Sequence, residues 1–448
     1  MVDPSLKDIR GHHYTLAKSV SDSAIMSGQS VIWLAAKDAS DALKSHSNLV
    51  PTFDHSMYAS YSKPGKNQDG KLTQKLEGLK KRILPRALVS ANAITQAPIE
   101  IDMEASMLRS LVDAFERFGI GPADRLLFHT ADGVTYEALA ALVQAFPYAD
   151  LPLIHICTPY DPVGVMPNRK SSEDVQRAID MFKATDLLGR RVFLHAENAL
   201  LADHLSKTWG CYVGALELPA EPVTERIKNR APTYRRERLA TADDRFLVVS
   251  LGAARLEKGF HLIPDIIRRT FEYAGAGEFA DVPADKVKFV LHASAQIIGR
   301  HPVIEKAIER FQSYSRDQVE LLTEPLSDTE YRSLTVASDA VLMPYDENAY
   351  RVRGSGVVSE AIAAKKFIIA KSGSYPAEMA MWQGGAVGET PAMIAKSLLT
   401  VVKNRWQRFE RVKKASEEYL SANSTQQYVQ KVIRSERRGV HDWVSLIN

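Results

Sequence analysis

The chain has 448 residues, of which 45% are hydrophobic and 25% charged, as in ordinary soluble globular proteins. Its 57 basic and 54 acidic residues give a net charge of +3, a balance too even to indicate a nucleic-acid partner. Only Cys157 and Cys211 are present, which excludes a disulfide framework or a cysteine metal cluster. With no apolar signal-peptide core and no window of transmembrane length, we expect a cytoplasmic protein.

Short apolar runs alternate with longer helical patterns through the first half of the chain. The helical patterns cover 103–119 and 171–189, the second opening with a serine and acidic residues as a capped helix does. The apolar runs predict buried strands at 30–36, 125–130, 151–158, 191–196 and 212–218. Such alternation favours a parallel sheet covered on both faces.

The pattern stops at 219–245, which is rich in proline and basic residues, and then resumes. The second half has predicted strands at 246–252, 287–294, 319–323, 339–344 and 367–371. The sequence therefore predicts an α/β protein with two Rossmann-like, doubly wound domains of similar size. We place the N-terminal domain at 1–220, the linker at 221–245, the C-terminal domain at 246–405 and terminal helices at 406–448.

Ligands of open parallel sheets bind at the carboxyl ends of the strands, and two strand ends in the second domain are unusual. The first, "SLGAARLEKGF", breaks at Gly252 and then presents Arg255 and Lys258. A guanidinium and an ammonium group could together neutralise a pyrophosphate and stabilise it as a leaving group. The alternative is that one or both cations are merely solvated.

The second strand end, "MPYDENAYRVRGSGVVSEAIA", starts a helix near Gly354, Ser355 and Gly356. Exposed amides at a helix N-terminus bind anions, and missing side chains let a phosphate approach. Glu360 lies one turn deeper on the same face as Gly356, where its carboxylate can accept hydrogen bonds from ribose hydroxyls. The alternative is a capped amphipathic helix with a solvated glutamate.

The two stretches together resemble the donor half of retaining nucleotide-sugar glycosyltransferases of the GT-B fold, over roughly 246–400. The resemblance implies two Rossmann-like domains facing a central cleft, with a C-terminal helix crossing back to the N-terminal domain. The implied donor-binding residues are Gly252, Arg255, Lys258, Arg353, Gly354, Ser355, Gly356 and Glu360. Arg255 and Lys258 would also act in catalysis, by taking up charge on the departing diphosphate.

One position departs from the resemblance. Such enzymes usually carry a second glutamate eight positions before the ribose one, and here that position is Val352. We expect Glu347, Tyr350, Arg351 or Arg353 to take over its contact with the donor sugar.

In the first domain, "DPSLKDIRGHHYTLAKS" resembles the glycine-containing loop that faces the cleft in such enzymes. The implied acceptor-binding residues are Gly11, His12, His13 and Asp132. His155 stands where many relatives carry a histidine facing the reacting sugar, with His129 as a second candidate; a strand histidine is more often a packed core residue. The strand before the loop is nearly absent, reduced to Met1 and Val2.

The chain has no HExxH motif, paired cysteines or Asp-x-Asp triplet, so we expect no metal and no cofactor, with cations and helix amides holding the diphosphate. Basic segments lie at 61–86 and 403–414. They could contact the anionic inner face of a membrane, although solvated protein faces are the commoner interpretation of such segments.

The predicted function is a metal-independent, retaining transfer of a hexose from a UDP- or GDP-sugar to a glycan, lipid-linked or other acceptor, as in polysaccharide or glycoconjugate synthesis. The alternatives are a nucleotide-sugar-binding protein without transferase activity and an epimerase of the same fold. A phosphorylase would need a lysine for pyridoxal phosphate, and no lysine stands out for that role.

Overall fold

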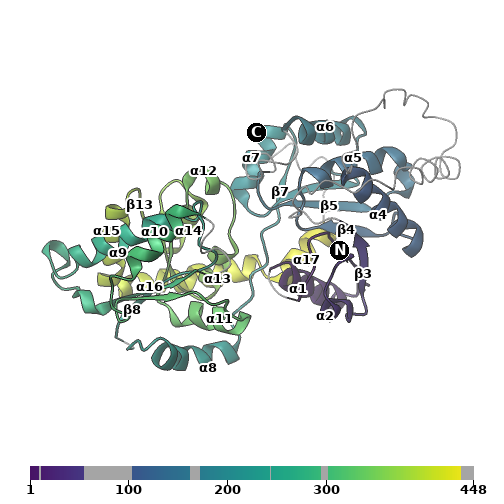
Figure 1. Cartoon of the computed structure of the whole chain (residues 1–448). Helices are drawn as coiled ribbons and strands as arrows, with labels where there is room; N and C mark the ends of the chain where they lie inside the picture. Colours follow the sequence, from purple (N-terminus) through teal and green to yellow (C-terminus); the bar gives the residue numbers. More distant parts are fainter. Residues whose placement is uncertain (10–11, 55–102, 162–171, 243, 294–300, 435–448) are drawn as a thin grey trace.

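The chain folds around two parallel sheets, each covered by helices (Figure 1). The computed structural model describes residues 1–9, 12–54, 103–161, 172–242, 244–293 and 301–434. Within these ranges the predicted fold class, two doubly wound α/β domains, is confirmed.

The N-terminal sheet has the strand order β3-β2-β1-β4-β5-β6-β7, with all neighbouring pairs parallel. Its strands are β1 (Val2–Asp3), β2 (Trp33–Ala36), β3 (Leu49–Phe53), β4 (Arg125–Phe128), β5 (Leu153–Thr158), β6 (Val192–Ala196) and β7 (Gly214–Ala215). Its helices are α1 (His12–Met26), α2 (Asp41–Lys44), α4 (Met103–Phe118), α5 (Gly133–Ala145), α6 (Ser172–Ala184) and α7 (Ala199–Trp209). Although β1 has only two residues, it lies in the middle of the sheet, because Val2 pairs with both Leu34 and Phe128.

The C-terminal sheet has the order β10-β9-β8-β11-β12-β13, again all parallel. Its strands are β8 (Phe246–Ser250), β9 (Val287–His292), β10 (Val319–Leu322), β11 (Ala340–Met343), β12 (Phe367–Lys371) and β13 (Ala386–Gly388). Its helices are α9 (Ile263–Tyr273), α10 (Pro302–Phe311), α11 (Asp328–Ala337), α12 (Glu347–Tyr350), α13 (Gly356–Ala363), α14 (Tyr375–Gln383) and α15 (Pro391–Lys403). The strand order reverses direction between β8 and β11, which is the topological switch point of this sheet.

The continuous apolar runs of the sequence reflect burial on both faces of each sheet. In β8, Phe246 and Val248 join the cluster under α9, α10 and α15, whereas Leu247 and Val249 join the cluster under α11, α13 and α14. All four side chains are at most 1% exposed, and each contributes about 1.5–3 kcal/mol by leaving water. Alternate residues of β8 are therefore buried on opposite faces of the sheet.

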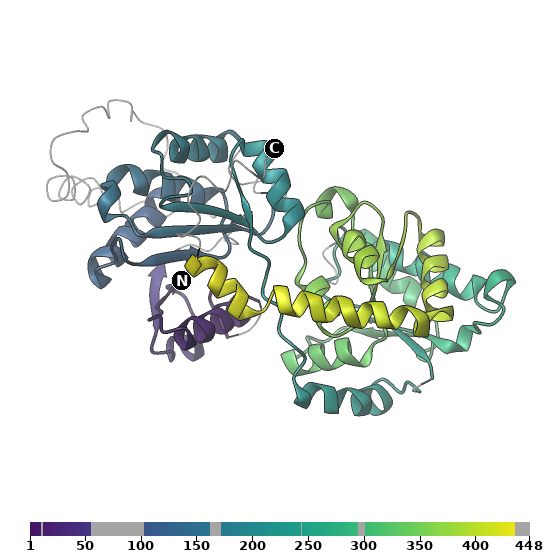
Figure 2. The ribbon, with the colours of Figure 1, turned by 180° about the vertical axis from the view of Figure 1, so that it is seen from behind.

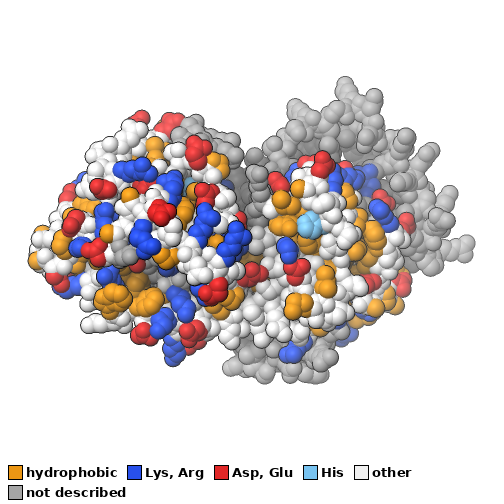
Figure 3. Space-filling view, turned by 90° about the horizontal axis from the view of Figure 1, so that it is seen from below, with side chains coloured by type: hydrophobic (Ala, Val, Ile, Leu, Met, Phe, Trp, Pro, Cys, Tyr) orange, Lys and Arg blue, Asp and Glu red, His pale blue; other side chains and the backbone are white. Residues whose placement is uncertain are grey.

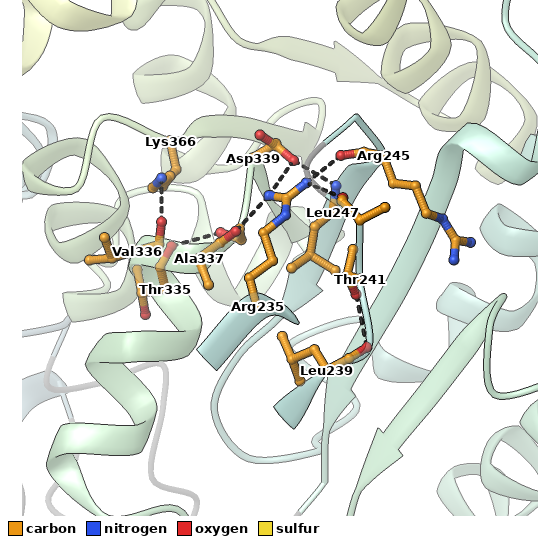
Figure 4. A network of polar contacts seen from close by, with 12 residues as sticks. Arg235, Leu239, Thr241, Arg245, Leu247, Thr335, Val336, Ala337, Asp339 and Lys366 are labelled. Atoms are coloured by element: carbon orange, nitrogen blue, oxygen red, sulfur yellow. Dashed lines mark hydrogen bonds and ion pairs between the residues drawn. The ribbon is translucent and has the colours of Figure 1, made fainter. Parts of the chain in front are cut away.

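The segment 219–245, which the sequence predicted to be irregular, is helical over much of its length. It forms α8 (Glu225–Thr233) and a π-helical turn, Tyr234–Arg238, and α8 packs against α11 of the C-terminal domain. Figure 4 shows how Arg235 anchors the turn: its guanidinium donates to Asp339 Oδ2 at 3.0 Å and to the Ala337 carbonyl at 2.8 Å. A buried guanidinium is costly unless it is paired, and both of these partners of Arg235 belong to the C-terminal domain. Most of the segment 219–245 is therefore structurally part of that domain.

The chain crosses back to the N-terminal domain at its end, as the resemblance implied. Figure 2 shows α16 (Arg405–Ala422) running along the C-terminal domain and α17 (Thr425–Arg434) continuing to the other. There α17 packs on α1, and Tyr428 and Val429 join Leu16 and Val20 in one hydrophobic cluster.

Candidate functional site

The carboxyl ends of β8 and β11 are joined directly. The backbone N–H of Asp346, after β11, donates to the carbonyl of Glu257, after β8, at 2.9 Å. Gly259 has a φ of +66°, and a Cβ at this position would lie 1.8 Å from the Pro344 carbonyl oxygen. Only glycine permits this approach, so the sequence supplies the residue that lets the two loops form one surface.

Lys258 reaches back from its loop to the end of β8. Gly252, at that end, has a φ of +91°, and a Cβ there would lie 2.7 Å from the Lys258 Nζ, so the missing side chain makes room for the ammonium group. Burial lowers the pKa of Lys258, and the positive charges of Arg255 and Arg353 lower it further. A bound anion would relieve this repulsion, because it would face all three cations at once.

Two tyrosine rings lie beside these cations. The ring centroids of Tyr345 and Tyr350 are 4.5 Å apart. The Lys258 Nζ lies 5.4 Å from the centre of the Tyr345 ring, and the Arg353 guanidinium lies 4.9 Å from that of Tyr350. Burial raises the pKa of Tyr345 to about 12, so its phenol stays protonated at neutral pH. Arg255 is more exposed, and its Nη1 lies 3.7 Å from Glu257.

Helix α13 begins at Gly356, with Ser355 as the residue before it in extended backbone conformation. The Ser355 side chain makes no capping hydrogen bond, so it does not occupy the amides of the first turn, and Gly356 is exposed. This arrangement suits an anion at the helix N-terminus. One turn on, Glu360 accepts a hydrogen bond from the Tyr331 hydroxyl at 2.9 Å, and reduced hydration raises the pKa of its carboxyl group.

The loop before α13 also contacts the N-terminal domain. The Asn198 Nδ2, after β6, donates to the Val352 carbonyl at 2.9 Å, and a Cβ on Gly354 would lie 2.2 Å from the Glu197 Oε1. Burial raises the pKa of Glu197 to about 8, although Arg353 and the Gly354 amide favour its charged form. The Glu197 carboxyl group of one domain, with its pKa raised to about 8, therefore faces the loop before α13 in the other domain.

Val352, where a glutamate was expected, is partly buried and packs against the hydrophobic core of the N-terminal domain. Of the residues predicted to replace that glutamate, Glu347 pairs instead with Lys371 at the end of β12, and Arg351 is exposed. Arg353 and Tyr350 do lie beside Lys258. At this position a valine side chain makes a contact between the domains.

The structure places His155 inside β5 rather than at its end, where the sequence prediction had put it. Its side chain is 0% exposed, stacks on Phe193 and has its Nδ1 3.2 Å from the His195 Nε2. Burial lowers the pKa of His155 well below its usual value. Thr158 ends the strand, so we assign His155 to the core and exclude it from the function proposed below.

The structure places three of the four residues predicted to bind the acceptor. Asp132 caps α5 by accepting from the Thr135 amide at 3.0 Å and is 6% exposed. His13 lies in the first turn of α1, and its Nδ1 is 2.7 Å from the Asp3 Oδ2. His12 begins the same helix, whereas Gly11 lies outside the described residues. His129, the second histidine candidate, contacts the same Asp3 oxygen at 3.0 Å.

Within the described residues, no helix is long and apolar enough to cross a membrane. The basic segment 61–86 lies outside them, whereas the cations of 403–414 have protein partners. Lys403 pairs with Asp281 at 3.0 Å, and Arg411 donates to the Trp382 carbonyl at 3.1 Å. Figure 3 shows basic and acidic side chains interspersed on the face of the molecule that it presents. These observations favour the interpretation that the cations of 403–414 are solvated or paired with other groups of the protein, over contact with a membrane.

Sequence reasoning missed several residues of this site. They are Asp3, Glu197, Asn198, Tyr331 and Tyr345. Glu197, Asn198 and Tyr345 directly follow predicted strands, so the rule that ligands bind at strand ends could have singled them out.

No family model and no curated protein matches the chain. Among solved structures, it is similar to a trehalose-6-phosphate structure from E. coli bound with UDP-2-fluoro glucose (TM-score 0.62, 11% identity, 98% of each chain). It is also similar to a UDP-forming trehalose-phosphate synthase from Burkholderia xenovorans (TM-score 0.59, 12% identity, 98% of each chain). A third is the sucrose-phosphate synthase from Thermosynechococcus elongatus (TM-score 0.55, 11% identity, 99% of this chain and 96% of that one). At these identities the similarity shows the fold, which is GT-B over nearly the whole chain.

Proposed function

We propose that this chain is a glycosyltransferase that moves a hexose from a nucleotide-diphosphate sugar to a glycan, lipid-linked or other acceptor. One observation carries the proposal: the Asp346–Glu257 hydrogen bond holds the loop of Lys258 against the loop that leads into α13. Three cations, two tyrosines and a helix N-terminus then meet at the switch point of the sheet. Two of the similar structures add support, one bound with UDP-2-fluoro glucose and one described as UDP-forming.

In this proposal the diphosphate rests on the first turn of α13, between Lys258, Arg255 and Arg353. Glu360, held by Tyr331, accepts hydrogen bonds from the ribose hydroxyls. As the bond between the sugar carbon and the phosphate oxygen breaks, its electron pair stays on the phosphate. The cations and helix amides stabilise that charge without a metal ion.

The acceptor oxygen then bonds to the sugar carbon on the face that the phosphate leaves, and its proton passes to the departing phosphate. This route gives retention and needs no strong protein base. The acceptor would enter from the N-terminal domain, where Glu197 presents a protonated carboxyl group beside Gly354. Glu197 is the best-placed group to contact the sugar, since Val352 faces the core.

A second candidate is a protein that binds nucleotide sugars without transferring them, favoured by Val352 at the usual glutamate position. The two candidates differ in turnover: a transferase slowly releases nucleoside diphosphate even to water, whereas a binding protein gives a thermal shift alone. Incubation with a panel of UDP- and GDP-hexoses, with and without acceptors, followed by assay of free UDP and GDP, separates them.

The decisive variant is Lys258→Ala, for which we expect a fall in turnover of about 100-fold or more, because a group that stabilises the leaving phosphate is lost. Its matched control is Lys396→Ala on α15, since the Lys396 Nζ also lies near a tyrosine ring, 5.6 Å from the centre of that of Tyr273 on α9. Nucleoside diphosphate release that is unaffected by Lys258→Ala, or equally lowered by Lys396→Ala, contradicts the proposal.

A further inference from the structure

A buried polar cluster lies at the switch point of the N-terminal sheet, in the domain opposite the donor site. Asp3 ends β1, His129 directly follows the neighbouring β4, and His13 lies in the first turn of α1. Their side chains are only 2%, 1% and 9% exposed, respectively. The fold thus brings His129, 126 positions from Asp3, to two residues near the start of the chain, and one carboxylate and two imidazoles lie together away from water.

The two imidazoles converge on a single carboxylate oxygen. The His13 Nδ1 lies 2.7 Å and the His129 Nε2 lies 3.0 Å from the Asp3 Oδ2, and the three atoms are all within 4.8 Å of one another. Two ligand atoms bound about 2.1 Å from one ion at the tetrahedral angle are about 3.4 Å apart. Both separations from the Asp3 Oδ2 are shorter than this by roughly 0.4–0.7 Å, so the three side chains must move apart to admit one ion between them.

The carboxylate is also oriented from outside the cluster. The Ser5 backbone N–H donates to the other carboxylate oxygen, Asp3 Oδ1, at 2.8 Å. Hydrogen bonds of this kind fix the orientation of metal-ligating carboxylates. Asp3 lies in β1, His13 in α1 and His129 directly after β4, so two of the three ligands stand on regular structure and the third at the end of a strand.

We propose that Asp3, His13 and His129 form a binding site for one divalent first-row transition-metal ion, with Zn²⁺ as the reference ion. Two imidazoles and one carboxylate are ligands that suit zinc and its neighbours, whereas Mg²⁺ and Ca²⁺ prefer oxygen ligands. When no ion is bound, the same three groups hold one another by hydrogen bonds, so the domain folds in either state. The site is separate from the diphosphate site and stands independently of the proposed function.

The test is a metal titration of the full-length, chelator-treated protein, with Zn²⁺ followed by calorimetry and Co²⁺ by its visible absorption. We expect one ion per chain, and binding at least about 10-fold weaker in His13→Gln and in His129→Gln. The matched control is His204→Gln, because the His204 Nε2 forms a similar pair with Asp161, at 3.0 Å, outside the cluster. This control should bind as the parent protein does.

The proposal is overturned if the parent protein binds neither ion, or if both histidine variants bind as tightly as the parent. Circular dichroism of each variant shows whether it has folded. Should His129→Gln unfold, His13→Gln decides, since His13 is the most exposed of the three residues. All of these measurements report metal binding only, so a negative result does not bear on the proposed glycosyltransferase activity.

Discussion

Asn198 of the N-terminal domain donates a hydrogen bond from its Nδ2 to the carbonyl of Val352 in the C-terminal domain, at 2.9 Å. The same side chain caps α7, because its Oδ1 accepts from the Leu201 amide at 2.9 Å. One residue thus caps a helix in its own domain and holds the loop before α13 of the other. The contact with Val352 helps to hold the two domains together at the proposed site.

Asn198→Asp separates these two roles, since it keeps the capping oxygen and replaces the donor with a carboxylate that repels the Val352 carbonyl. We expect a looser contact between domains and a fall in the free energy of unfolding of about 1–3 kcal/mol, because Asn198 is only 1% exposed and the new carboxylate faces a carbonyl. Small-angle X-ray scattering should show a larger radius of gyration for the variant. Asn198→Ala loses the cap as well as the donor, and its stability should fall by about 0.5–2 kcal/mol through loss of the cap; an unchanged stability of this variant would argue against the capping role.

Gly259→Ala should separate the two loops of the proposed donor site. Its Cβ would collide with the Pro344 carbonyl, and its φ of +66° adds a cost of about 1–2 kcal/mol. Gly275→Ala is the matched control, with a φ of +75° but no atom within 4 Å of the added Cβ. We expect Gly275→Ala to lose only the backbone cost and to bind nucleotide normally, whereas Gly259→Ala loses both stability and nucleotide affinity. Denaturant unfolding and UDP titration measure the two effects.

Glu360→Ala should weaken nucleotide affinity without unfolding the protein, because its carboxyl group faces the proposed ribose site. Tyr331→Phe removes only the 2.9 Å hydrogen bond that orients this carboxyl group, so we expect a smaller loss, about 0.5–1.5 kcal/mol. Calorimetric titration with UDP and GDP gives both values. Affinity that survives Glu360→Ala unchanged would mean that the ribose lies elsewhere.

The raised pKa of Glu197 predicts that the stability of the protein depends on pH. Its pKa rises from an ordinary value of 4.5 to about 8 in the folded protein. Between these values the unfolded chain releases the proton and the folded chain keeps it, so this residue makes the free energy of unfolding fall as pH rises. Glu197→Gln removes that loss, and its stability relative to the parent should increase from pH 4.5 to pH 8, by roughly 2 kcal/mol after allowance for partial exposure.

The control for this experiment is Glu116→Gln on α4, where the side chain is exposed. Its stability relative to the parent should stay level over the same pH range. If the curve for Glu197→Gln is equally flat, the Glu197 carboxyl group is already ionised in the folded protein at neutral pH.

The sequence allowed the fold class to be predicted because burial on both faces of a parallel sheet leaves an unbroken apolar run, as in Phe246–Ser250. β13 and β3 escaped prediction: β13 has only three residues, and β3 carries Pro51 within its run. Gly354, Ser355 and Gly356 stood out because small residues where a helix begins leave its backbone amides accessible to an anion.

The contacts between the domains could not be predicted in the same way. Asn198 and Val352, which join the two domains, are 154 positions apart. Local patterns carry no information about which distant residues meet, since that depends on how the two sheets are placed in space. His155 shows the converse error: its strand was found, but three more residues of β5 follow it and keep it inside the sheet.

The return of the chain to its first domain has a consequence for biosynthesis. Leu16 and Val20 on α1 are covered by Tyr428 and Val429, which leave the ribosome more than 400 residues later. During translation, the C-terminal sheet can form while this face of α1 is still bare. A nascent chain arrested before α17 should therefore bind trigger-factor-type chaperones or hydrophobic dyes through its N-terminal half, and release them once the last helix emerges.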